Sequence, residues 1–236
     1  MNGPADLVGA AVWNDLRVSD FARSARGHLG GADHRFGERR VRMQLTEHTV
    51  HLCFDMQMLF SPGGPWPTPW LPRVLPVVEE IAARFPERTV FTRFITPKQP
   101  EDLPGAWRQY YRRWRETTRE QIDPELLELL PELKRLAPPA TVIDKTRYSA
   151  FAEPALHRHL YDRRADGLII TGSETDVCVL ATVLGAVDLG YPVAVVCDAV
   201  CSSSDQGHDA VLEVYRGRYS QQIETIGAEA LLREWR

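Results

Sequence analysis

The sequence places Cys178 where an apolar run, a turn and a helical stretch meet. Residues 167–170 (Gly-Leu-Ile-Ile) are typical of a buried strand, and residues 172–178 (Gly-Ser-Glu-Thr-Asp-Val-Cys) follow almost at once. Residues 179–189 have helical length and end before Gly190, a residue type that commonly follows a helix. Unpaired N–H groups at a helix start favour a thiolate and an oxyanion beside it. Cys178 is therefore a candidate nucleophile, although a free cysteine is more often a small buried hydrophobe.

Two charged residues stand at the ends of other predicted strands. Asp55 follows the apolar-rich run 50–54, and Lys145 closes residues 141–144. Open α/β sheets place their ligands at the carboxyl ends of the strands. Either residue alone is most simply a surface group at a strand terminus. Together with Cys178, they predict one reactive site along one edge of a sheet.

The order of strand-like and helix-like segments predicts the fold that would hold these groups. Strand-like runs near 49–55, 88–94, 141–144, 167–172, 193–198 and 222–226 alternate with helix-like stretches near 73–85, 106–119, 124–136, 153–163, 178–189 and 205–218. This alternation favours an α/β three-layer sandwich, with a mostly parallel sheet of about six strands and helices on both faces. A length of 236 residues with 44% hydrophobic content is enough for one core.

Several motifs, in order, give the chain a resemblance to a known family. Residues 54–57, 144–151, 172–179 and 190–199 together resemble the isochorismatase-like cysteine hydrolase superfamily over roughly residues 47–230. Relatives of this kind include N-carbamoylsarcosine amidohydrolase, ureidoacrylate and biuret hydrolases, and nicotinamidases. The resemblance implies a Rossmann-like strand order and a triad of Cys178 as nucleophile, Asp55 as base and Lys145. It also implies a cis peptide bond between Ser173 and Glu174 and an oxyanion hole made by the backbone N–H groups of Glu174 and Cys178.

The implied reaction is hydrolysis of a carbon–nitrogen bond in a small amide, ureide or hydrazide through a thioester on Cys178. Two alternatives stay open. In a vinyl ether hydrolase of the isochorismatase kind, Asp55 would act as general acid and Cys178 would be dispensable. In a non-catalytic binding protein on the same fold, Asp55 and Lys145 would have no reason to meet Cys178.

No metal site and no cofactor are expected. Nicotinamidases, which residues 60–64 resemble, carry a metal held by an Asp and two His, but this chain has Pro72 and residues 95–97 (Ile-Thr-Pro) at about those positions. His157 and His159 are two residues apart in a predicted helix and therefore do not face together. Cys197 and Cys201 lack a second ligand pair at zinc spacing.

Substrate contacts are predicted from aromatic residues and one arginine. In residues 106–115, four aromatic residues recur at helical spacing, and arginines occupy another face. The simpler interpretation is a packed aromatic face and a solvated basic face. We predict that some of these residues and others after the strands contact substrate, with Arg93 meeting an anionic group: Gln57, Phe60, Trp66, Arg93, Trp107, Tyr111 and Tyr148.

The net charge and the cysteine content indicate which kinds of binding partner and which cellular compartment to expect. A net charge of −4 gives no general attraction to nucleic acid or to anionic membranes. Four cysteines with no framework spacing favour a reducing, cytoplasmic setting. The expected partners are a small-molecule substrate and, by resemblance, further copies in a dimer or tetramer. Residues 47–236 form the predicted hydrolase domain. Residues 1–46 are an extension that contacts a neighbouring subunit, covers the pocket or is disordered.

Overall fold

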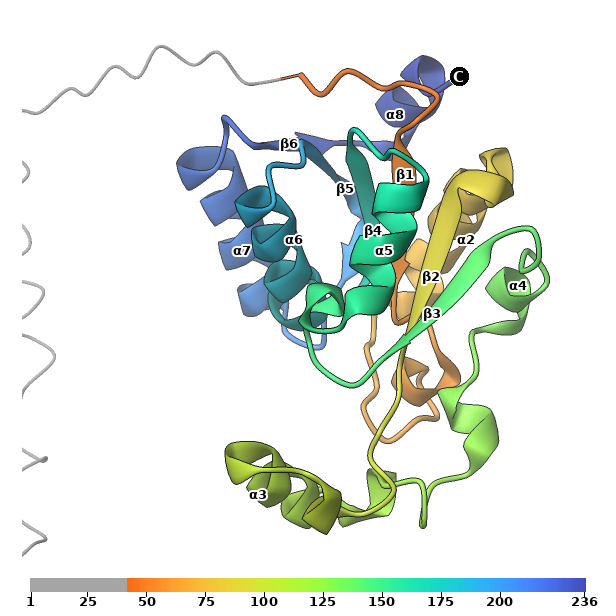
Figure 1. The fold of residues 1–236 in the computed structure, drawn as a ribbon, viewed down its shortest axis with the longest axis vertical. Helices are drawn as coiled ribbons and strands as arrows, with labels where there is room; N and C mark the ends of the chain where they lie inside the picture. The colour runs from red at the N-terminus through yellow and green to blue at the C-terminus, as the bar shows by residue number, and fades with distance from the viewer. Residues whose placement is uncertain (1–41) are drawn as a thin grey trace, which may run out of the picture. The chain divides into compact units, whose positions relative to one another are not determined.

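Six strands form a single parallel sheet in the computed structural model, which describes residues 42–236 (Figure 1). The sheet order is β3-β2-β1-β4-β5-β6, and every neighbouring pair is parallel. The predicted α/β sandwich is therefore confirmed, and each predicted strand is present. The strands are β1 (Val50–Phe54), β2 (Thr89–Phe94), β3 (Thr141–Lys145), β4 (Leu168–Ser173), β5 (Val193–Cys201) and β6 (Ile223–Ile226).

Helices cover both faces of the sheet, as Figure 1 shows. On one face, α2 (Leu71–Arg84) and α8 (Ala228–Glu234) pack against the central strands. On the other face lie α5 (Pro154–Asp162), α6 (Leu180–Asp188) and α7 (Asp205–Arg218). Because both faces are covered, β4 is buried along its whole length, which explains its nearly continuous apolar sequence.

Two predicted helices are shorter than their patterns suggested. The helix predicted over 106–119 is α3 (Gly105–Arg113), because Trp114 leaves the helical backbone, and a 3-10 turn at Arg115–Thr117 follows. The helix predicted over 124–136 is a 3-10 turn at Pro124–Leu127 and the short α4 (Pro131–Lys134). Leu130, which precedes a proline, has an extended backbone and separates the two. Helix α8 was not predicted.

The chain reverses its direction of sheet growth between β1 and β4, and these strands approach very closely at their carboxyl ends. Gly172 on β4 has φ +102°, and a Cβ there would lie 2.2 Å from the carbonyl oxygen of Phe54 on β1. Only glycine fits such an approach. A position where strand order reverses is where open α/β sheets bind ligands.

A buried histidine lies beneath this edge on β1. The ring of His51 contacts the hydroxyls of Thr171 at 2.8 Å and Thr89 at 3.2 Å. Burial lowers the pKa of His51 to about 3, so the ring is neutral in the folded protein at neutral pH.

The folded domain includes a few residues before position 47. Met43 is buried against Gly167, and its backbone N–H donates to Glu224 at 2.7 Å. The predictions made for residues 1–41 lie outside the described residues. Within residues 42–236, none of the helices has the length and apolar character needed to cross a bilayer.

Candidate active site

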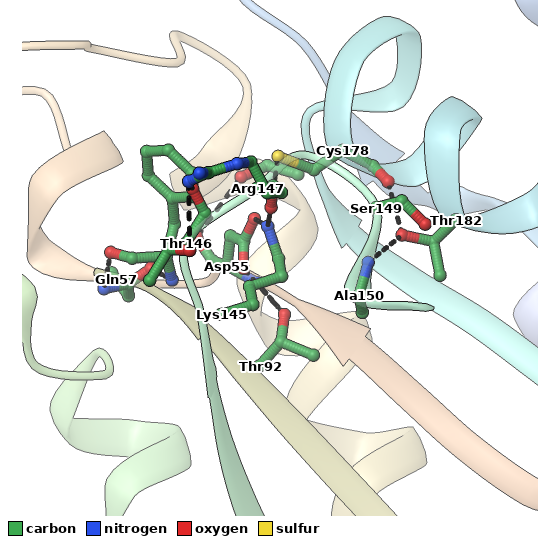
Figure 2. Close-up of polar contacts among 12 residues, drawn as sticks. Asp55, Gln57, Thr92, Lys145, Thr146, Arg147, Ser149, Ala150, Cys178 and Thr182 are labelled. Atoms are coloured by element: carbon green, nitrogen blue, oxygen red, sulfur yellow. Dashed lines mark hydrogen bonds and ion pairs between the residues drawn. The ribbon is translucent and has the colours of Figure 1, made fainter. Parts of the chain in front are cut away.

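Cys178 lies in the first turn after β4, at the start of the helix that the sequence predicted. The segment Thr175–Val179 forms a π-helical turn that continues into α6. The peptide bond between Ser173 and Glu174, directly before this turn, is cis, at the position that the family resemblance implies. Figure 2 shows the side chains of Asp55, Lys145 and Cys178 pointing toward one another.

Lys145 contacts both other members of this group. Its Nζ lies 2.7 Å from Oδ2 of Asp55 and 3.4 Å from Sγ of Cys178 (Figure 2). A third contact, from Nζ to the carbonyl oxygen of Arg147 at 3.1 Å, holds the ammonium in place. All three side chains are enclosed, with exposed fractions of 0% for Asp55, 1% for Lys145 and 5% for Cys178. We call these three residues the floor of the site.

Burial and charge set the resting protonation of the floor. Burial alone would lower the pKa of Lys145, but the opposing effects of Asp55 and Cys178 outweigh it, so the pKa is raised and the amine is charged. Burial, with Asp55 beside the thiol, raises the pKa of Cys178 well above its ordinary value despite Lys145. These effects outweigh the helix start and favour the thiol over the thiolate, so a base is needed to form the nucleophile. Asp55 and the thiol share Nζ of Lys145 as a neighbour, which makes this carboxylate the candidate to take the thiol proton.

Asp55 is oriented by the neighbouring strand. The hydroxyl of Thr92 on β2 donates to Oδ1 of Asp55 at 2.6 Å, while Lys145 contacts Oδ2. Asp55 itself has φ +51°, a left-handed conformation that aspartate tolerates better than most residues. No sequence pattern indicated Thr92, because only the register of β1 against β2 brings it beside Asp55.

A second threonine connects the segment after Lys145 to the nucleophile turn. The hydroxyl of Thr182 on α6 donates to the carbonyl oxygen of Cys178 at 2.8 Å and accepts the N–H of Ala150 at 3.1 Å (Figure 2). Thr182 is fully buried. It therefore fixes the nucleophile turn relative to the segment that follows β3.

The other side of the nucleophile turn is anchored to α7 and the loop before it. Asp176 accepts the hydroxyl of Ser202, and Thr175 shares a 2.9 Å hydrogen bond with His208. Gly207 leaves room for this arrangement, because a Cβ there would lie 2.0 Å from Oδ2 of Asp176. These contacts hold the turn from both flanks.

A cavity of about 350 Å³ opens onto the sulfur of Cys178. Besides Cys178 it is lined by Glu174, Val177, Ser203, two prolines and several aromatic rings. Trp66 is the centre of these rings, with centroids about 6 Å from those of four others. We call the rings the aromatic wall: Phe60, Trp66, Phe94, Tyr110, Trp114 and Tyr148.

Two residues that we predicted to contact substrate face elsewhere. The side-chain amide of Gln57 is fully buried and bonds to the backbone of Phe94 and Leu127, so it joins loops and does not line the cavity. Arg93 is held by ion pairs to Asp144 and Glu128 and does not line the cavity either. The sequence pattern of the strands could not reveal the partners of Gln57 and Arg93, because those partners lie in other segments of the chain.

The aromatic helix presents a different pair of rings from the pair we predicted. Trp107 and Tyr111 do not line the cavity, whereas Tyr110 and Trp114 do. Trp107 packs behind Tyr148, with ring centroids 4.9 Å apart, and Tyr111 is buried. Spacing alone identified the aromatic face but not which part of it turns toward Cys178. Phe60, Trp66 and Tyr148 line the cavity as predicted.

The cavity does not offer the metal ligands of a nicotinamidase. Glu174 is the single carboxylate in the lining, and the lining contains no histidine. Over residues 42–236, no three histidine, cysteine or acidic side chains cluster as metal ligands would. The donor set therefore does not fit a zinc-type site.

Comparison with known proteins places this chain in one family. The model of the isochorismatase domain matches residues 49–226, three quarters of the chain. The chain belongs to the isochorismatase family. A secreted isochorismatase effector of Phytophthora sojae is 39% identical over 93 residues, which span 38% of this chain and 44% of that protein. The chain thus aligns with less than half of this curated relative.

Solved structures of the isochorismatase family share the same architecture. A cysteine hydrolase from Pseudomonas syringae superposes with a TM-score of 0.71 at 22% identity, over 84% of this chain and 97% of that one. A pyrazinamidase of Pyrococcus horikoshii, solved in complex with zinc, gives a TM-score of 0.59 at 26% identity, over 76% of this chain and 99% of that one. The match to the isochorismatase family confirms the resemblance drawn from the motifs.

Proposed function

We propose that this isochorismatase-family protein is a cysteine hydrolase that cleaves the carbon–nitrogen bond of a small amide, ureide or hydrazide without a metal ion. One observation carries the proposal: a single buried ammonium contacts both a carboxylate and a thiol, and the thiol lines a cavity. The contact of Lys145 with both partners favours this function over a non-catalytic binding protein.

The acylation step follows from the protonation of the floor. Asp55 accepts the proton of the Cys178 thiol as sulfur attacks the carbonyl carbon of the substrate. Lys145 stabilises the negative charge as it moves from carboxylate to sulfur. In the tetrahedral intermediate the carbonyl oxygen becomes an oxyanion, which we assign to the backbone N–H groups of Glu174 and Cys178. The carbon–nitrogen bond then breaks, and Asp55 returns the proton to the leaving nitrogen.

Deacylation uses the same groups. A water molecule attacks the thioester carbon and gives one proton to Asp55. The carbon–sulfur bond breaks, the acid product leaves, and the proton passes back to the sulfur of Cys178. The net reaction is addition of one water across the carbon–nitrogen bond, with the enzyme restored.

The test is turnover of a panel of small amides, ureides and hydrazides, measured by release of ammonia, amine or hydrazine. Cys178→Ser should lose at least about 10³-fold in kcat/KM, because the nucleophile is removed. Cys197→Ser is the matched control, since Cys197 lies on β5 beside Arg216 and away from the cavity lining. Mass spectrometry of quenched wild-type protein should detect an acyl group on Cys178.

Two results would contradict the proposal. Turnover of amides by Cys178→Ser at near wild-type rate would remove the thiol from the mechanism. Hydrolysis of isochorismate that survives Cys178→Ser but not Asp55→Asn would establish the vinyl ether alternative, in which Asp55 is the general acid.

A further inference from the structure

The aromatic wall and its single acid point to a specific chemical class of ligand. We propose that the cavity selects substrates with a positively charged nitrogen, such as a quaternary or protonated ammonium group, on the part of the molecule away from the scissile amide. The position of the amide at Cys178 rests on the proposed function. The preference for a cation rests on the cavity lining alone.

The ring geometry of the wall suits a cation. Trp66 meets Phe60, Phe94, Tyr110 and Trp114 with centroids 6.0 to 6.2 Å apart and interplanar angles from 31° to 81°. The rings therefore lie at several orientations around one cavity, and a π face, unlike the positive ring edge, attracts a cation. A cation within about 6 Å of a ring centroid is attracted by the ring quadrupole, and aromatic cages are a recurring solution for ammonium groups.

The charges around the cavity favour the same class. Lys145 and Asp55 neutralise one another at the floor, and the raised pKa of Cys178 keeps its thiol uncharged. Glu174 is the single charged residue among those that line the cavity. Its Oε1 accepts the N–H of Ser203 at 3.0 Å, which holds the carboxylate at the wall. The site as a whole therefore carries about one negative charge, which attracts a cation and repels an anion.

Two arginines near the cavity are engaged elsewhere, whereas Arg113 lies 5.7 Å from the ring of Trp114 and the ammonium of Lys145 lies 4.9 Å from the ring of Phe94. Arg93 is bound by Asp144 and Glu128, and the guanidinium of Arg147 lies over Trp107 while donating to Thr146. Neither arginine lines the cavity. Burial raises the pKa of Tyr110 and of Tyr148, so both phenols are protonated and neutral at physiological pH. These facts replace our earlier prediction of an anionic substrate group bound by Arg93.

The experiment compares three benzamides that differ in charge at one position. The probes carry at the para position a trimethylammoniomethyl group, its neutral isostere neopentyl, or a carboxymethyl group. Binding is measured by titration calorimetry with the Cys178→Ser protein, so that the readout does not depend on turnover. We expect the cationic probe to bind at least about tenfold more tightly than the neutral isostere, and the anionic probe to bind most weakly.

Two variants assign the preference to residues. Glu174→Gln keeps the backbone N–H and an oxygen that accepts from Ser203. It should weaken binding of the cationic probe about tenfold and leave binding of the neutral isostere unchanged. Glu229→Gln, at an exposed position of α8, is the matched control and should change neither. Equal or weaker binding of the cation than of its isostere, or failure of all three probes to bind, would overturn the inference.

These outcomes separate the inference from the proposed function. Preferential binding of the cation without hydrolysis by the wild-type protein keeps the ligand class and rejects the amidase. Hydrolysis of neutral amides through Cys178 without a preference for cations keeps the amidase and rejects the ligand class.

Discussion

The floor and the aromatic wall of the cavity are built in different ways. Each floor residue stands at or just after a strand end and is fixed by polar contacts: Asp55 by Thr92 and Lys145, and Lys145 by Asp55 and a backbone carbonyl. The wall combines rings from the loop after β1, from the end of β2, from α3 and the residue after it, and from the segment after β3, joined by ring contacts. The sheet thus supplies the reactive groups at fixed positions, while longer connections supply the shape that selects a ligand.

The sharpest way to test this division is to separate thiol reactivity from turnover. Asp55→Asn should lower kcat/KM for an amide by at least about 10³-fold, because no base accepts the thiol proton. The same change should speed alkylation of Cys178 by iodoacetamide near neutral pH. Asp55 raises the pKa of the thiol, and Lys145, which lowers it, would remain.

The measurement is the pH dependence of alkylation at each cysteine, read by peptide mass spectrometry. In the wild type, alkylation of Cys178 should be slow at pH 7 and rise at higher pH, because its pKa lies well above the ordinary value. Cys197, which is partly exposed, is the internal reference. A fall in Cys178 alkylation in Asp55→Asn would contradict the charge arrangement of the floor.

Removal of one charge from the floor should also lower the stability of the protein considerably. Lys145→Met leaves the carboxylate of Asp55 buried without its ion-pair partner, so the free energy of unfolding should fall by about 3 kcal/mol. Urea denaturation measures this change. The double variant Asp55→Asn with Lys145→Met should recover much of the loss without recovering activity, since no unpaired charge remains. Equal instability of the single and double variants would mean that packing, not charge, dominates.

Substitutions in the aromatic wall should change KM more than they change the stability of the protein. Trp114→Ala removes a cavity ring and should raise KM about tenfold with a smaller change in kcat. Trp107→Ala, on α3 shortly before Trp114 but outside the lining, should change KM by less than about threefold. Steady-state kinetics of both variants, on one amide that the protein hydrolyses, measures these changes. Equal effects would show that the segment acts as a packed unit rather than through individual rings.

The smallest expected effect belongs to the strand beneath the floor. His51 has a pKa of about 6.5 when unfolded and about 3 when folded, so only the unfolded chain gains its proton between these values. Stability from this group is complete above pH 6.5 and is lost as the pH falls toward 3. Between pH 6.5 and 5.5 the loss should be about 1 kcal/mol. In His51→Gln, urea denaturation should give a flatter dependence over this interval. An unchanged slope would assign the acid sensitivity to other groups.

That the three groups meet was predictable because their positions depend on strand ends. A parallel sheet brings the carboxyl ends of its strands to one edge, so the positions of Asp55, Lys145 and Cys178 at or after apolar runs predicted one site, and the family resemblance implied their roles. The contributions of Thr92 and Thr182 were not predictable, because each depends on the register or packing of two separate elements.

What the sequence determined by itself was the α/β fold, the order of its strands and helices, and the three groups of the floor. These follow from local periodicity and from a rule that holds for every parallel sheet. Only the tertiary structure decided the rest: that Arg93 pairs with Asp144 and Glu128, that Tyr110 rather than Tyr111 lines the cavity, and that burial raises the pKa of the Cys178 thiol. Ion pairing, side-chain direction and burial depend on residues distant in the chain, and no local pattern encodes them.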